Sequence, residues 1–269
     1  FINSRAGRPL RIISEHLEPE ARFEEQGISD TIVFFGSSRI LSRSDARAAL
    51  KKARRKKQPA KDDIGRAEQA MKMSRYYEDA RELAYRLTKW SKGLAGRAKG
   101  KDGADRRFVV CTGGGPGIME AACRGASEAR GINIGLNIAI PEEQFKNPYI
   151  TRELAFEFHY FFMRKFWFVY LAKAMVVFPG GFGTIDEFFE VLTLVQTKKV
   201  KKKMPIVLFG TSFWNDVIDI EAMARFGTIG PEDRNLFFKT DDTDEAYAFI
   251  TSELERDWLH LPGGRKELV

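Results

Sequence analysis

A glycine-rich segment between an apolar run and a helical pattern could bind a phosphate group. In TGGGPGIMEAA, the chain places Gly114, Gly115 and Gly117 at this position. Glycine lets the backbone come close to a phosphate, and the free N–H groups of a helix start attract anions. The spacing does not fit the dinucleotide-binding fingerprint, and no Gly-Lys-Ser/Thr follows as in a P-loop. We expect another kind of phosphate-binding turn here, with a tight strand-to-helix turn as the structural alternative.

A second glycine segment, PGGFGTIDE, adds a hydroxyl group and two carboxylates to the free backbone. Its glycines are Gly180, Gly181 and Gly183. We expect Thr184 to donate to a phosphate or to cap the following helix.

The two carboxylates of this segment have a structural and a functional interpretation. In the first turn of a helix, Asp186 and Glu187 would stabilise the helix dipole by about 0.3–1 kcal/mol. Alternatively, Glu187 faces a crevice and acts as an acid, a base or an electrostatic stabiliser. Neighbouring helical residues point about 100° apart, so at most one of the two would face a ligand directly.

The apolar stretch FHYFFMRKFWFVYLA carries two charges, Arg164 and Lys165. A helix that is apolar nearly all round is buried or lies at an interface, where charges need partners. Either the two side chains reach the surface along apolar neighbours, or Arg164 enters the crevice and pairs with Glu187 or a bound anion. We also expect Gly36, Ser37 and Ser38, which follow the first apolar run, to contact a ligand as hydrogen-bonding groups rather than as nucleophiles.

Short apolar runs alternate with helical patterns along the chain, which predicts parallel strands covered by helices on both faces. Strands are expected at 31–36, at the start of 107–131, in INIGLNIAIP, in AMVVF and in MPIVLFG. The fold class is therefore α/β: a Rossmann-like, doubly wound parallel sheet flanked by helices in a single domain. Ligands bind at the carboxyl ends of such strands, so the glycine turns after the first, second and fourth predicted strands should line one crevice.

Further helices are predicted between and after these strands. They cover 66–91, 156–173, TSFWNDVIDIEAMARFG as one helix, and TDEAYAFITSELERDW, while Gly131 is expected to end the helix after TGGGPG.

The domain is expected to span 31–258. Residues 1–30 form a polar N-terminal extension with a short helical piece, and 259–269 form a polar tail. A basic insert at about 43–65 contains KKARRKK, and GLAGRAKGKDGADRR is expected to be a flexible loop.

Composition excludes several classes of protein. Of 269 residues, 43% are apolar and 30% charged, and no run approaches the roughly 18 apolar residues of a membrane span. Two cysteines are too few for a disulfide framework or a cysteine-only zinc site, so a reducing, cytoplasmic setting is expected. The net charge of +7 is concentrated in KKARRKK and TKKVKKK. Such runs are usually solvated faces, and nucleic acid is considered an unlikely partner because no nucleic-acid-binding motif is present.

Together, GGGPGIMEAA, FFMRKFWF and PGGFGTIDE resemble the LONELY GUY (LOG) family, whose members have long been labelled possible lysine decarboxylases. Residues Pro179 to Glu187 match the family motif PGGxGTxxE completely, and the resemblance covers about 30–215. The N-terminal extension and the basic insert resemble the longer microbial members.

The resemblance implies a phosphoribohydrolase that cleaves the N-glycosidic bond of a nucleoside 5′-monophosphate, AMP or a cytokinin riboside monophosphate, to free base and ribose 5-phosphate. The catalytic arginine and glutamate of the family fall on Arg164 and Glu187. The glycine turns, with Thr184 and Lys165, would contact the substrate. The family also implies a homodimer or higher homo-oligomer, for which the helix at 156–170 is a candidate surface. No cofactor and no metal site is expected.

Other functions remain open on the same fold. The chain could bind a nucleotide or a molybdenum cofactor without cleaving it, or transfer the ribosyl group to another acceptor. Lysine decarboxylation is disfavoured because Lys165 is the only lysine in the crevice motifs.

Overall fold

The computed structural model describes residues 1–55, 61–97, 105–139 and 147–259. A seven-stranded sheet runs through its centre in the order β4-β3-β2-β1-β5-β6-β7, and all neighbouring strands are parallel. The strands are β1 Thr31–Phe35, β2 Val109–Thr112, β3 Asn133–Ile138, β4 Ala155–Phe158, β5 Ala172–Val177, β6 Ile206–Phe209 and β7 Phe238–Thr240. This is the doubly wound, Rossmann-like α/β fold that the sequence predicts.

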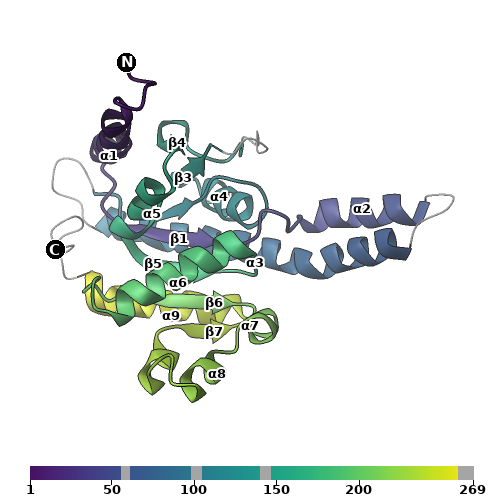
Figure 1. Ribbon diagram of the computed structural model, residues 1–269. Coiled ribbons are helices and arrows are strands. Elements are labelled where there is room, and N and C mark those ends of the chain that lie inside the picture. Colours follow the sequence, from purple (N-terminus) through teal and green to yellow (C-terminus); the bar gives the residue numbers. More distant parts are fainter. Residues whose placement is uncertain (56–60, 98–104, 140–146, 260–269) are drawn as a thin grey trace.

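Helices cover both faces of the sheet (Figure 1). The α-helices are α1 Arg8–Glu25, α2 Arg43–Arg55, α3 Lys61–Arg97, α4 Ile118–Glu128, α5 Phe161–Tyr170, α6 Phe182–Gln196, α7 Thr211–Val217, α8 Ile220–Arg225 and α9 Thr243–Trp258, and the 3₁₀ helices are η1 Arg152–Leu154 and η2 Pro231–Asn235.

Alternate residues of β1 belong to two separate cores. Val33 and Phe35 pack with α1, α5 and α6 on one face, while Ile32 and Phe34 pack with α3, α4 and α9 on the other. All five residues of the strand are buried. Burial on both faces explains why the central strands show no alternating polar pattern in the sequence.

The direction of the chain reverses at the centre of the sheet. From β1 it continues through β2 and β3 to β4 on one side, and β5 then pairs with the other edge of β1. The loops that follow β1 and β5 therefore leave the sheet in different directions, which opens a crevice at their carboxyl ends. A backbone bond from Ser37 N to Pro179 O, 3.0 Å long, joins the two loops at the base of this crevice.

The expected helix at 156–173 is too long at both ends, because α5 spans only Phe161–Tyr170 and β5 already begins at Ala172. Residues Ala155–Phe158 form β4, and α5 begins only at Phe161. The segment AFEF has alternating exposed and buried residues, as in a strand at a sheet edge. The run of aromatic residues that follows hid this short alternation in the sequence. Because β4 is an additional strand, the PGGFGTIDE loop follows the fifth strand rather than the fourth.

The N-terminal region contains more structure than the expected short helical piece. Helix α1 is 18 residues long, and its Phe23 is buried against Phe156 and Trp167. The basic insert is helical on both sides of the residues left undescribed, since α2 and α3 flank them. The predicted loop after Gly93 starts later than expected because α3 continues to Arg97, and most of that loop lies outside the described residues.

Three smaller differences from the predicted elements concern a divided helix, the end of α4 and an additional strand. The expected single helix after β6 is divided into α7 and α8, because Ile218 is extended and Asp219 caps α8 through Ala222 N. Helix α4 ends before Gly131, and the left-handed residue there is Arg130, with φ 56°. Strand β7 has only three residues and was not predicted. The tail from residue 260 onward lies outside the described residues.

No helix in the described part of the chain has both the length and the apolar character needed to cross a membrane.

Candidate active site

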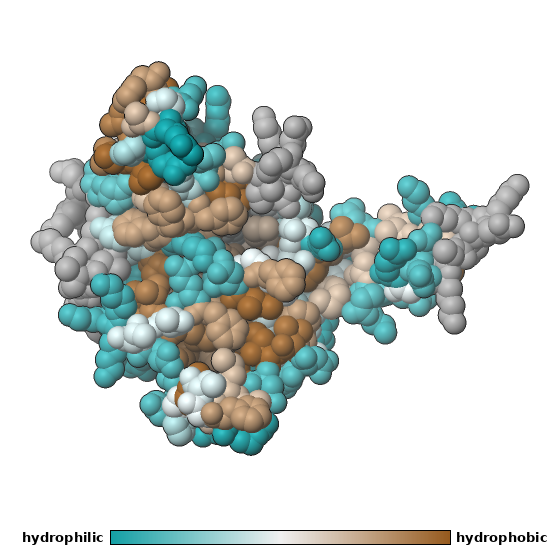
Figure 2. All heavy atoms as spheres, in the orientation of Figure 1, coloured by the Kyte–Doolittle hydropathy of each residue, from teal (hydrophilic) through white to brown (hydrophobic). Residues whose placement is uncertain are grey.

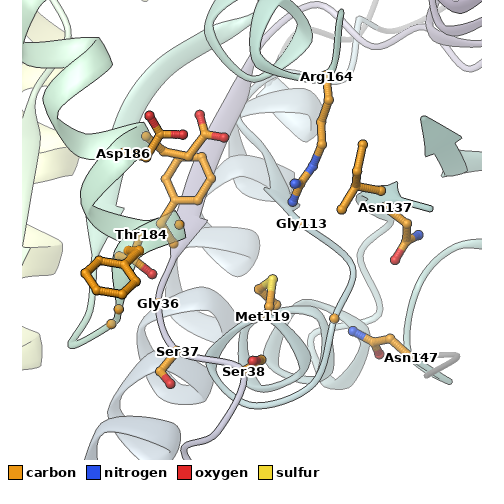
Figure 3. Close-up of a pocket in the computed structure, with 18 of the residues that line it drawn as sticks. Gly36, Ser37, Ser38, Gly113, Met119, Asn137, Asn147, Arg164, Thr184 and Asp186 are labelled. Atoms are coloured by element: carbon orange, nitrogen blue, oxygen red, sulfur yellow. The ribbon is translucent and has the colours of Figure 1, made fainter. Parts of the chain in front are cut away.

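A cleft of about 1590 Å³ opens at the carboxyl ends of β1, β2 and β5, which lie side by side in the sheet. This is ample for a nucleotide, since sites for small molecules commonly enclose about 300–1000 Å³. The loops after the three strands and the first turns of α6 supply much of its lining: Gly36, Ser37, Ser38, Gly113, Gly115, Gly180, Gly181, Gly183, Thr184, Asp186 and Glu187. Arg164 enters the cleft from α5 (Figure 3). The structure therefore brings the three predicted glycine turns together.

Glu187 is a buried carboxyl group in this cleft. Its side chain is only 6% exposed, and burial raises its pKa from 4.5 to about 7, although the positive charges of Lys165 and Arg164 oppose the change. The helix begins at Phe182, so Glu187 lies in the second turn rather than in the expected first turn. The helix dipole acts mainly within the first turn, so helix-start stabilisation does not account for this residue. Asp186 also lines the cleft, but its side chain is 57% exposed.

Arg164 is held in place by the protein before any ligand binds. Its Nε donates to Leu136 O at 2.8 Å, and its guanidinium lies 5.0 Å from the ring centre of Phe168. A Cβ atom at Gly113 would lie 2.5 Å from Nη2 of Arg164, so the glycine provides the space for the guanidinium. Figure 3 shows the two residues next to each other in the cleft.

Of the two alternatives for Arg164, entry into the cleft is the one observed. Of the two partners suggested for it there, Glu187 forms no ion pair with it among the described residues, and a bound anion stays a prediction. The positive charge of Arg164 still acts on Glu187, because it opposes the rise in pKa that burial causes.

Lys165 is not among the residues that line the cleft, although one of its partners, Asp186, is. Its ammonium group pairs with Asp186 at 2.7 Å and with Glu190 at 2.9 Å, and the side chain is 19% exposed. Two carboxylates of the protein therefore already bind the ammonium group that was predicted to contact the substrate. Its role as a phosphate ligand stays a prediction, and a ligand would have to compete with these two carboxylates.

The N-terminus of α6 is the part of the cleft best suited to an anion. Its N-cap residue, Gly181, provides no side-chain cap, so the first N–H groups of the helix depend on a ligand or water. Cβ atoms at Gly181 or Gly183 would meet no atom within 4 Å, so the backbone is open to the cleft there. Thr184 is the third helical residue rather than the cap, and its largely buried side chain also lines the cleft.

The loop before α4 is largely occupied by contacts within the protein. Ile118 N, the first N–H of the helix, donates to Ser37 O at 3.1 Å. Gly117 has φ 70°, and a Cβ atom there would lie 2.3 Å from the same oxygen. A Cβ atom at Gly114 would lie 2.2 Å from the side-chain oxygen of Asn137. Gly114 and Gly117 are thus explained by close packing between loops, and neither belongs to the described lining of the cleft.

Gly36 also has a packing role, because its Cβ atom would lie 2.6 Å from the Ile118 side chain. Ser37 Oγ accepts a bond from Arg39 N at 3.1 Å and thereby stabilises the turn.

The sequence analysis missed the apolar part of the cleft. Its side chains come from five different elements or loops: Met119, Ile138, Phe156, Phe182 and Phe213. Such surfaces suit the flat face of an aromatic base. Asn137 was also missed, although its place at the carboxyl end of β3 could have identified it.

Within the described residues, no group of three or more His, Cys, Asp or Glu side chains is arranged to hold a metal ion.

The comparison with protein families identifies the class of protein that this fold and cleft define. Residues 119–250 match the family described as "Possible lysine decarboxylase". The match covers just under half of the chain, and together with the three motifs that the cleft brings together it supports a LOG-family protein. The matched family domain supports a nucleotide-related function. A search of curated proteins gives no match.

Three solved structures are similar to the chain. A structural-genomics structure of TM1055 has 20% identity and a TM-score of 0.48 over 83% of this chain and 99% of its own. The molybdenum cofactor binding protein of Rippkaea orientalis has 19% identity and a TM-score of 0.40 over 65% of this chain and 87% of its own. The Moco carrier protein of Chlamydomonas reinhardtii has 20% identity and a TM-score of 0.44 over 85% of this chain and 99% of its own.

Proposed function

We propose that the protein hydrolyses the N-glycosidic bond of a nucleoside 5′-monophosphate, AMP or a cytokinin riboside monophosphate, to the free base and ribose 5-phosphate. The observation that carries the proposal is the buried carboxyl group of Glu187, whose pKa is raised to about 7, beside an uncapped helix N-terminus in one cleft. A group with such a pKa can exchange protons near neutral pH.

In the proposed complex, the 5′-phosphate binds at the N-terminus of α6. The open backbone at Gly181 and Gly183 admits the phosphate oxygens, and Thr184 adds a hydroxyl group. These contacts lie away from the bond that breaks, so their binding energy positions the sugar for reaction.

The bond between C1′ and the base breaks with its electrons leaving on the base, which gives an oxocarbenium-like sugar. In its ionised form, Glu187 stabilises this cation or removes a proton from the attacking water, whose oxygen forms the new bond to C1′. The departing base takes up that proton and leaves as the free base. Arg164, fixed by Leu136 O, contacts the ribose or the phosphate and keeps part of the Glu187 population ionised. Because the ionised form is required, kcat/KM is expected to rise with pH through about 7.

The apolar surfaces of the cleft are expected to contact the base. Met119, Phe182 and Phe213 offer flat or adaptable contacts that do not depend on the polar groups of a particular base.

The family description names lysine decarboxylation, which the geometry does not favour. Lys165 is the only lysine of the cleft motifs, and it is bound by Asp186 and Glu190 rather than presented to a ligand.

The test is chromatography of reactions with AMP, isopentenyladenosine monophosphate, GMP and CMP. Free base together with ribose 5-phosphate is the expected result. Nucleotide binding without release of base would instead favour a carrier, and base release without ribose 5-phosphate would favour ribosyl transfer.

A further inference from the structure

The basic insert forms a structural feature that the proposed active site does not use. Helix α2 and the beginning of α3 project from the body of the molecule (Figure 1). Within α2, the only buried residues are Ala46 and Ala53, seven positions apart on the face that contacts α3. The sheet is covered by the later part of α3, where Tyr77, Leu83 and Leu87 are buried. The projecting part is therefore not explained by the hydrophobic core.

The structure separates the basic residues of α2 into two groups. Two have acidic side chains near them: Arg54 pairs with Glu68 at 2.8 Å, and the positive charge of Arg43 opposes the rise in the pKa of Asp79. The other four are exposed, and in the part of the chain that is described they form no ion pair. These outer cations are Arg47, Lys51, Lys52 and Arg55.

The outer cations form a regular row. A helix turns about 100° per residue, so Arg47, Lys51 and Arg55 follow one another at four-residue intervals, each about 40° further round the helix. Lys51 and Arg55 lie opposite the buried alanines, and Arg47 and Lys52 lie on the two flanks of that side. Successive members of the row are separated by about 6 Å along the helix axis. The one acidic residue of α2, Asp45, is at its start and accepts a bond from Ser42 Oγ at 2.7 Å.

A row of like charges is unfavourable without a counter-charge, since like charges at i and i+4 destabilise a helix. Its complement is a polymer with regularly spaced negative charges. A folded acidic protein does not repeat its charge at a fixed interval, whereas a phosphodiester backbone does.

From this geometry we propose that the outer cations of α2 bind the phosphodiester backbone of a nucleic acid, without reading its sequence. Phosphate contacts of this kind give affinity but carry no base information. The sequence alone favoured a solvated face for these charges. The structure changes that interpretation because it places the four outer cations, which form no ion pair within the described residues, on a helix that projects from the body of the molecule.

The test is fluorescence anisotropy with labelled RNA and DNA duplexes of one sequence, titrated with the full chain at several salt concentrations. Four phosphate contacts predict a slope of log K against log salt of about −3.6, or a loss of about 100-fold between roughly 50 and 200 mM salt. The quadruple variant Arg47→Gln, Lys51→Gln, Lys52→Gln, Arg55→Gln keeps residues that favour helices. It is expected to bind at least about 10-fold more weakly, with a slope close to zero.

The matched control removes four exposed lysines from the TKKVKKK segment: Lys198, Lys199, Lys201 and Lys203. It lowers the net charge by the same amount and is expected to bind like the native chain. Circular dichroism verifies that both variants keep their helices.

Two arms distinguish the source of the phosphates: the RNA and DNA duplexes are compared with each other and with phosphatidylserine vesicles. Binding to either duplex that is lost only in the α2 variant supports the proposal. It is overturned if the native chain does not bind at about 50 mM salt, if the control variant loses as much affinity, or if binding is restricted to vesicles.

Discussion

At the scale of single residues, Glu187 shows a conflict between stability and function. Its carboxyl group is buried by the protein, so the ionised form that the proposed chemistry needs is disfavoured in the folded state. Conflicts of this kind are typical of functional sites, although buried ion networks can produce them as well.

Replacing Glu187 with Gln is expected to stabilise the folded protein at alkaline pH. The folded pKa lies above the unfolded one, so the stabilising contribution of the protonated group is complete below about 4.5 and is lost as the pH rises through about 7. The loss corresponds to at most about 3 kcal/mol. Thermal unfolding should therefore show Glu187→Gln to be more stable than the native protein at pH 8, with a smaller difference at pH 5. An equal difference at both pH values would contradict the raised pKa.

Gly113 is the residue that makes space for Arg164. Gly113→Ala is expected to displace the guanidinium, because the new Cβ would lie 2.5 Å from Nη2, and to lower kcat/KM by at least about 10-fold. Base release under steady-state conditions measures this change.

The matched control is Gly65→Ala in α3, where a Cβ atom meets nothing within 4 Å. It should leave activity unchanged and stabilise the helix by about 0.5–1 kcal/mol. If both variants retain full activity, the observed position of the Arg164 guanidinium is not required for catalysis.

At the scale of elements, α6 is the structure that joins phosphate binding to chemistry. Its uncapped N-terminus and Glu187 lie within two turns of each other, so a ligand held at one end is placed near the carboxyl group.

A pair of variants at Phe182 separates the backbone N–H from the aromatic ring. Phe182 is the first residue of α6, where proline is well tolerated because it removes only an N–H that has no partner in the helix. Phe182→Pro removes the N–H and the ring, and Phe182→Ala removes the ring alone. Isothermal titration calorimetry with AMP and adenosine should show that only the proline variant loses preference for AMP, by about 10-fold. Equal loss in both variants would assign the effect to the ring.

The sequence was sufficient to predict those elements whose signal lies within a short stretch of neighbouring residues. The buried strands, the glycine loops after them and helix α9, at Thr243–Trp258 as predicted, all follow from apolar runs and helix signals. It was insufficient where tertiary contacts decide: β4 depends on pairing with β3, and α1 on the burial of Phe23.

Within the cleft, the same limit applies to residue roles. Sequence spacing grouped Gly114, Gly117 and Lys165 with the phosphate ligands, but only three-dimensional contacts show that the glycines serve loop packing and that Lys165 pairs with carboxylates.

At the scale of the whole molecule, an apolar face extends over two neighbouring helices. On α1, the exposed residues Leu10, Ile13 and Leu17 are spaced along one side, and on α5 Phe161 and Phe162 are more than half exposed. Two hydrogen bonds connect α1 to the start of α5: the backbone N–H groups of His159 and Tyr160 donate to the carboxylate of Glu15. Figure 2 shows apolar residues gathered at the end of the molecule where Figure 1 places α1. Patches of this kind commonly mark interfaces between proteins.

We expect this face to form a homodimer, as the family resemblance implies. Light scattering of the native chain should give twice the mass of one chain, and the double variant Ile13→Glu, Phe162→Glu should give a monomer, because buried unpaired carboxylates are costly. Phe226→Glu, at a residue 79% exposed beyond α8, is the control and should stay dimeric. A monomeric native chain at micromolar concentration would contradict the prediction.

The central claim is that Glu187 and its cleft cleave a nucleoside 5′-monophosphate, and the most direct measurement is quantification of both products from AMP. Purified native protein and Glu187→Ala are incubated with AMP, and adenine and ribose 5-phosphate are measured together over time. The account predicts equal amounts of the two products from the native protein and a loss of about 100-fold or more in the variant. Native protein that binds AMP but releases no base, or a variant that releases base as fast as the native protein, would contradict it.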